Sequence, residues 1–146
     1  MGTTHAAGFP QDVWVSGTDR VLSRVAPFSD SVRIVRSTPI LPFNGPRCLW
    51  SHRASSAAAA AKACSASSED PINEDVTSWI RQAAGNWTNV GVIDLNDEVC
   101  PGGVCRAERD GMPIFRDTQH LTAEYVEHLS DRLKEELGDA LESPDE

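Results

Sequence analysis

The sequence lacks both the long hydrophobic run and the basic surface that two large classes of protein require. None of its apolar stretches approaches the roughly 20 residues that a helix needs to span a bilayer. Its 13 lysines and arginines are outnumbered by 22 aspartates and glutamates, and the formal net charge is −9. Because no basic stripe is present to neutralise phosphates, nucleic acid and anionic lipid are not expected as the main partners.

The first residues also lack the pattern of a secretory signal peptide. Residues 1–10 contain no basic segment followed by an apolar one, so we expect no export signal within the printed chain. With 146 residues, of which 40% are hydrophobic and 24% charged, the composition is that of one globular domain. We expect this domain to cover residues 1–138 and the acidic segment 139–146 to be a disordered tail.

The four cysteines form two pairs that are close in sequence. Cys48 can pair with Cys64, and Cys100 with Cys105, which is typical of loop-stapling disulfides made in an oxidising compartment. A zinc site is the alternative. Zinc sites usually combine close cysteine pairs, such as Cys-x-x-Cys, with histidine. Cys100 and Cys105 are separated by four residues, and the chain has no other closely spaced pair of cysteines.

The apolar pattern predicts alternating helices and strands, and hence an α/β fold with a largely parallel sheet. We predict helices at 11–25, 70–84 and 122–137, and strands at 31–37 and 90–95. Between them, 38–69 reads as a long connection that a Cys48–Cys64 bridge would tie down, with a turn or two of helix in the alanine run 57–63. The dipeptide Asp110-Gly111 predicts a hairpin between 104–108 and 112–115.

The hairpin is followed by an Asp-x-x-His motif at the start of the last predicted helix. At this spacing the Asp117 carboxylate can fold back onto the His120 imidazole, fix its tautomer and stabilise its protonated form. The two residues would then make two-thirds of a hydrolytic triad. The alternative is that both simply serve as helix-entry residues.

The run VGVIDLNDEVCPGGVCRAERDGMPIFRDTQHL, residues 90–121, resembles the last block of SGNH/GDSL-type hydrolase domains. It is most similar to the version found on the C-terminal side of bacterial membrane O-acyltransferases of the acyltransferase 3 family. The Thr38-Pro39 and Pro46-Arg47-Cys48 segments also resemble that family. The resemblance implies a three-layer α/β/α, flavodoxin-like SGNH fold, of which this chain would be the incomplete C-terminal part.

The chain departs from the family pattern where the nucleophile should be. SGNH enzymes take their serine from a Gly-Asp-Ser block, and their oxyanion donors from that block and two further upstream blocks. No such block is present in residues 1–146. Ser16 lies inside a predicted helix without the preceding Gly-Asp, and Ser37 corresponds to a different part of the family pattern, so we assign neither as nucleophile.

Two classes of function are therefore expected. In the first, the chain is part of an ester-chemistry domain in which His120 acts as general base and Asp117 orients it, with a serine supplied from upstream and no cofactor or metal. The resemblance then implies acylated glycans or lipid-linked sugars of the cell envelope as substrates, a membrane acyltransferase domain in cis or in trans as partner, and an extracytoplasmic location. In the second, the chain is a non-catalytic remnant or accessory binding module; as an isolated chain it is expected to be inactive in either case.

Overall fold

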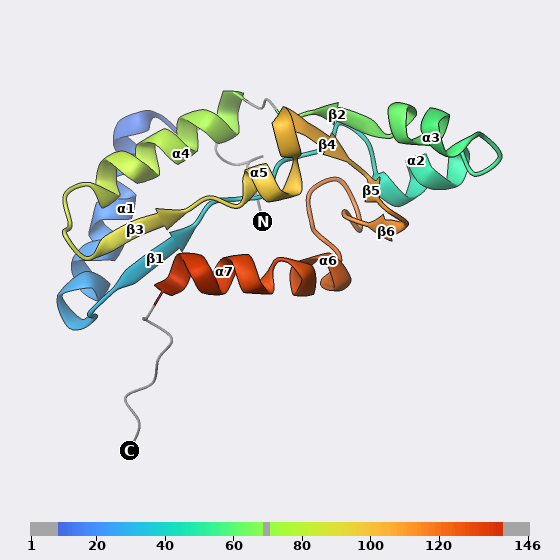
Figure 1. The fold of residues 1–146 in the computed structure, drawn as a ribbon. Helices are drawn as coiled ribbons and strands as arrows, with labels where there is room; N and C mark the ends of the chain where they lie inside the picture. Colours follow the sequence, from blue (N-terminus) through green and yellow to red (C-terminus); the bar gives the residue numbers. More distant parts are fainter. Residues whose placement is uncertain (1–8, 69–70, 139–146) are drawn as a thin grey trace, which may run out of the picture. The chain divides into compact units, whose positions relative to one another are not determined.

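The computed structural model describes residues 9–68 and 71–138 (Figure 1). The chain divides into two compact units: unit 1 takes its described residues from 1–37, 70–94 and 137–146, and unit 2 from 38–69 and 95–136. The elements in chain order are α1 (Gln11–Val25), η2 (Ala26–Phe28), β1 (Val32–Val35), α2 (Gly45–Ser51), α3 (Ala57–Ala63), β2 (Ser65–Ser67), α4 (Pro71–Ala84), β3 (Val90–Ile93), α5 (Asn96–Val99), η3 (Pro101–Gly103), β4 (Val104–Arg106), β5 (Glu108–Arg109), β6 (Met112–Pro113), α6 (Ala123–His128) and α7 (Ser130–Leu137).

Unit 1 is built on a parallel pair of strands. β1 and β3 run side by side in register from Val32 opposite Val90 to Val35 opposite Ile93. Helices α1 and α4 pack against each other, and α4 also contacts β3. Residues 11–25 and 70–84 were predicted as helices from their apolar spacing, and both helices form. These elements agree with the α/β class that the sequence predicted, whereas among the described residues only one of the three two-stranded sheets is parallel.

An ionic cluster lies where the two parallel strands end. Arg36 follows β1, and its guanidinium bonds to the Asp94 carboxylate after β3 at 2.8 Å and to Glu74 of α4. Arg81 of α4 reaches the same Asp94 oxygen at 2.8 Å. These contacts join the carboxyl ends of both strands to the helix that covers them.

Unit 2 carries the hairpin, together with a strand pairing that was not predicted. β5 pairs with β6 across Asp110-Gly111, as expected for this dipeptide. β4, however, pairs with β2 in antiparallel register, Ala66 opposite Cys105. The predicted hairpin is therefore present, and the Ile114 amide extends it by donating to the Ala107 carbonyl at 2.9 Å, whereas residues 104–106 pair with residues 65–67, which was not predicted.

The core of unit 2 contains one of two disulfide bonds. Cys100 and Cys105 are bonded to each other and buried among apolar and aromatic side chains. The other members of this buried cluster are Leu41, Val99, Ile114, Phe115, Tyr125 and Leu129. The second bond, Cys48–Cys64, joins α2 to the end of α3. Both pairs that the sequence predicted are present.

The remaining differences concern short helices. The connection 38–69 contains α2 and β2 as well as the predicted helix in the alanine run. The single predicted helix 122–137 is two short helices, α6 and α7, separated by Leu129, which lies buried in the core. In the described part of the chain, no helix has the length and hydropathy needed to cross a membrane. The expected tail 139–146 lies outside the described residues.

Candidate active site

The Asp-x-x-His motif lies in a short loop that is closed at its base by the core of unit 2. Phe115 and Leu121 form an antiparallel bridge, and the Thr122 amide donates to the Ile114 carbonyl at 2.9 Å. Ile114 and Phe115 are fully buried. The Thr122 hydroxyl then accepts from the Tyr125 amide and begins α6, as its position predicted. The loop 116–120 thus projects from a fixed stem.

Asp117 organises this loop with both of its carboxylate oxygens. Oδ1 accepts hydrogen bonds from the backbone amides of Gln119 and His120, each at 2.8 Å. Oδ2 lies 2.7 Å from Nδ1 of the His120 ring. Because a carboxylate can only accept, Nδ1 must carry the hydrogen, and Nε2 of the neutral ring is left as an acceptor.

The charge of Asp117 is stabilised by the same contacts. Hydrogen bonds from the Gln119 and His120 amides, followed by the His120 side chain, hold the pKa of the Asp117 carboxyl well below its usual range. The carboxylate therefore remains ionised throughout the pH range in which a histidine can act as a base. It can hold the imidazole in one tautomer and stabilise the imidazolium formed when Nε2 takes a proton.

His120 has the access that such a base needs. Its side chain is 45% exposed, and within the described residues its Nε2 has no hydrogen-bond partner. The prediction that the two side chains would meet and that His120 would face solvent agrees with this geometry. Their catalytic role stays a prediction.

Sequence reasoning missed the segment that holds the loop from the other side. Residues 38–45, which we call the supporting segment, bond to three successive carbonyls of the loop. Thr38 Oγ1 donates to Gln119 at 2.6 Å, the Leu41 amide to Thr118 at 2.7 Å, and the Gly45 amide to Asp117 at 3.1 Å. The loop is thereby fixed at its backbone, and the Asp117–His120 pair does not depend on its own contact alone.

Gly45 packs tightly against the loop and its stem. A Cβ placed on Gly45 would lie 3.3 Å from Phe115 Cβ and 3.5 Å from the Asp117 carbonyl oxygen. Gly45 also begins α2, where the Asn44 side chain accepts from the Arg47 amide as an N-cap. The Asn44-Gly45-Pro46 tripeptide is a sequence signal that could have predicted this helix start.

Among the described residues, no hydrogen bond joins a serine hydroxyl to His120. The Ser16 hydroxyl bonds back to the Val13 carbonyl within α1, and the Ser37 hydroxyl bonds to the Asn73 side chain. Neither shows a contact with a histidine. The pair thus has the geometry of a general base and its orienting acid, without a nucleophile.

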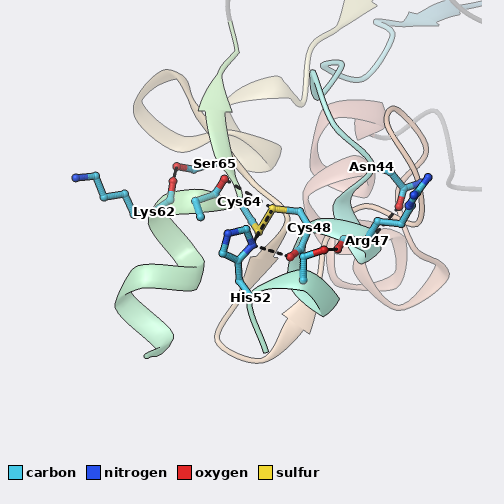
Figure 2. The surroundings of a disulfide bond; sticks show 9 residues. Asn44, Arg47, Cys48, His52, Lys62, Cys64 and Ser65 are labelled. Carbon is cyan, nitrogen blue, oxygen red and sulfur yellow. Dashed lines mark hydrogen bonds between the residues drawn. A yellow bond between two sulfur atoms is a disulfide. The ribbon is translucent and has the colours of Figure 1, made fainter. Parts of the chain in front are cut away.

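A second group of chemically active side chains surrounds the Cys48–Cys64 bond (Figure 2). Cys48, His52 and Cys64 bring three potential metal-ligand atoms within 4.8 Å of one another. The two sulfurs, however, are bonded to each other, and a disulfide offers no thiolate to a metal. His52 was not singled out from the sequence, although its spacing of four residues from Cys48 on a helix places both on one face.

The comparisons with known proteins agree with the resemblance seen in the sequence. A family model described as "SGNH domain (fused to AT3 domains)" matches residues 3–135. Neither the curated proteins nor the solved structures contain a significant match to the chain.

Proposed function

Because the chain belongs to the family of SGNH domains that are fused to AT3 domains, we propose that it carries the acid–base half of a serine-dependent acyl-transfer or ester-hydrolysis site. The observation that carries this proposal is the 2.7 Å contact between Asp117 Oδ2 and His120 Nδ1, with Nε2 exposed and free to accept a proton.

The chemistry follows from the tautomer. A serine hydroxyl placed against Nε2 of His120 would lose its proton to that nitrogen as its oxygen attacks the acyl carbonyl. The imidazolium formed would be stabilised by Asp117 through Nδ1–H. It would then return the proton to the departing sugar oxygen, which completes the transfer of the acyl group to the serine.

The serine and the oxyanion donors would come from a segment outside these 146 residues. Unit 1 has features that suit such a completion. β1 and β3 form a pair with no further strand among the described residues, and Val35 on β1 is 56% exposed. We propose that further strands extend this pair into the three-layer α/β/α arrangement of the complete domain.

The substrate class and location follow from the same family context. A domain fused to a membrane acyltransferase would act on O-acylated glycans or lipid-linked sugars at the cell envelope. The two disulfide bonds support an extracytoplasmic location, since such bonds persist in oxidising compartments.

A non-catalytic accessory module is the second candidate. The absence of a Gly-Asp-Ser block from residues 1–146 favours it. Such a module would keep the fold and the Asp117–His120 contact but would never react with a serine-directed probe.

Labelling with a fluorophosphonate separates the two candidates. We expect the 146-residue chain alone to stay unlabelled, because reactivity requires a serine in contact with His120 and an oxyanion hole. Joined to a segment that bears the family's Gly-Asp-Ser block, it should be labelled at that serine, and His120→Ala should abolish the labelling. Stoichiometric labelling of the chain alone at Ser16 or Ser37 would refute the proposal, and a completed domain that never labels would favour the accessory module.

A further inference from the structure

The two disulfide bonds of unit 2 lie in different chemical surroundings. Cys100 and Cys105 are 1% and 0% exposed within the apolar core, and no histidine contacts either sulfur in the described part of the chain. Cys48 is only partly buried, and both sulfurs of the Cys48–Cys64 bond have an imidazole beside them. The partly buried Cys48 and the neighbouring imidazole are features that a disulfide bond with a purely structural role does not need.

His52 is held in a defined orientation next to this bond. It lies one helical turn after Cys48, and its Nδ1 is 3.0 Å from the Cys48 backbone carbonyl. A carbonyl oxygen can only accept, so Nδ1 carries a hydrogen. Figure 2 shows the ring directed at the bond, with Nδ1 3.8 Å from Sγ of Cys48 and 3.8 Å from Sγ of Cys64. An N–H donor therefore lies equally close to both sulfurs.

Small molecules can reach this group of residues. A pocket of about 360 Å³ is lined by His52 and Cys64 together with Arg53, Ala60, Arg106 and Glu108. The volume is at the lower end of the range of small-molecule sites. Cys100 and Cys105 do not line this pocket.

From these observations we propose that Cys48–Cys64 is a thiol–disulfide exchange site, in which His52 stabilises the thiolate that leaves when the bond is opened. The substrate class is a reducing thiol, either a small free thiol or the dithiol of a partner protein. The proposal is independent of the ester chemistry, because its test follows the sulfur atoms alone.

The exchange takes place in two balanced steps. An incoming thiolate attacks Sγ of Cys48, the less buried of the two cysteines, and a new S–S bond forms as the Cys48–Cys64 bond breaks. The electron pair leaves on Sγ of Cys64, and Nδ1–H of His52 turns from the Cys48 carbonyl, 3.0 Å away, to donate its hydrogen bond to that thiolate. A second thiolate attacks the mixed disulfide, leaves as the oxidised reagent, and releases Cys48 as a thiolate that takes a proton from solvent.

The test is a rate measurement on the oxidised 146-residue chain. The chain is mixed with reduced glutathione, free thiols are trapped with an alkylating reagent at set times, and peptide mapping reports each bond separately. We expect Cys48–Cys64 to open at least about tenfold faster than Cys100–Cys105, since exposure and a donor to the leaving sulfur both favour exchange. A parallel reaction with a small protein that bears a Cys-x-x-Cys dithiol identifies which kind of thiol the site prefers.

Variants at His52 separate its role from mere exposure of the bond. His52→Gln and His52→Ala should slow the opening of Cys48–Cys64 about tenfold, the size expected when a developing charge loses one hydrogen bond, and should leave the Cys100–Cys105 rate unchanged. His128→Gln, at an exposed histidine on α6, should change neither rate. If His52→Ala increases the opening rate of both bonds, that substitution has loosened the fold. The opening rate of Cys48–Cys64 in His52→Gln then decides whether His52 assists the exchange.

The proposal is overturned if the two bonds of the wild-type chain open at the same rate. It is equally overturned if His52→Gln leaves the Cys48–Cys64 rate unchanged or raises it.

Discussion

Asp117 makes three contacts, which have two separate consequences. Its contacts with the Gln119 and His120 amides shape the loop, whereas its contact with Nδ1 of His120 sets the tautomer. A carboxylate that contacted only Nδ1 would set the tautomer but leave the imidazole on a flexible segment. The carboxylate couples the backbone of the loop to the ring, so a single substitution at Asp117 should disturb both.

The depressed pKa of Asp117 predicts how stability depends on pH. A carboxyl whose pKa is lower in the folded than in the unfolded state stabilises the fold above its unfolded value of about 4, and this contribution is lost as pH falls toward the folded value. Asp117→Asn should therefore lower the free energy of unfolding most at neutral pH, and the difference from wild type should shrink below pH of about 4. Urea unfolding at several pH values measures this. Asp97→Asn, at an exposed aspartate of α5, is the control, and an equally pH-dependent effect in that variant would contradict the assignment.

Gly45 predicts a packing effect on the same loop. An added Cβ would press on Phe115 and on the Asp117 carbonyl, so Gly45→Ala should destabilise by about 1–3 kcal/mol, the usual range for overpacking. Nothing lies within 4 Å of a Cβ at Gly17, in the exposed interior of α1, and there alanine should stabilise by about 0.5–1 kcal/mol. Thermal unfolding of both variants tests whether Gly45→Ala lowers and Gly17→Ala raises the stability. A neutral Gly45→Ala would show that the supporting segment yields without strain.

The Asp117–His120 contact could be predicted from the sequence because it is local. Three residues of separation and the polarity of the two side chains suffice to bring them together. The contact of Thr38 with Gln119 joins residues 81 positions apart. No spacing rule predicts such a bond, because the fold of the intervening chain decides it.

The same distinction holds for the helices and strands. Helices α1 and α4 could be predicted because their apolar spacing and end signals lie within each helix. The partner of β4 could not, because pairing depends on where the Cys48–Cys64 bond places residues 65–67. The break at Leu129 between α6 and α7 was missed for a related reason, since a continuous apolar stripe does not reveal which of its residues turns into the core.

The disulfide bonds predict unequal losses of stability for the elements they join. On loop-closure entropy, removing Cys48–Cys64, with its separation of 16 residues, should lower stability by about 3 kcal/mol. Removing Cys100–Cys105, with its separation of 5, should lower it by about 2 kcal/mol before any loss of core packing. Chemical unfolding of the two paired Cys→Ser variants measures both. If the Cys48→Ser/Cys64→Ser variant is as stable as wild type, the bond does not constrain α2 and α3.

At the scale of the whole molecule, unit 1 exposes apolar surface that the proposed further strands would cover. Phe28 is 87% exposed and Val35 56% exposed, and β1 and β3 have no third strand among the described residues. The lack of a Gly-Asp-Ser block in residues 1–146 led to the proposal that further strands extend this pair. Where such strands would lie could not be predicted from the sequence, because strand order depends on contacts between distant parts of a domain.

The open edge of β1 predicts self-association of the chain. Unpaired strand edges with exposed apolar side chains tend to pair with other chains, and a charge there opposes such pairing. Val35→Lys should therefore reduce association in sedimentation velocity without lowering the melting temperature by more than a few degrees. Ser23→Lys, which adds the same charge on the exposed surface of α1, should leave association nearly unchanged. An equal effect of both variants would show that net charge alone, and not the strand edge, controls association.

The measurement that tests the central claim most directly is the turnover of an acyl ester by the completed domain. With the Gly-Asp-Ser segment joined to this chain, hydrolysis of 4-nitrophenyl acetate should fall on the order of 10³-fold or more in His120→Ala and by a comparable factor in Asp117→Asn, as expected when one member of a catalytic triad is removed. His128→Ala, at an exposed histidine of the same unit, should retain wild-type kcat. If His120→Ala and His128→Ala turn over the ester at the same rate as wild type, His120 is not the base, and the Asp117–His120 contact only stabilises the loop.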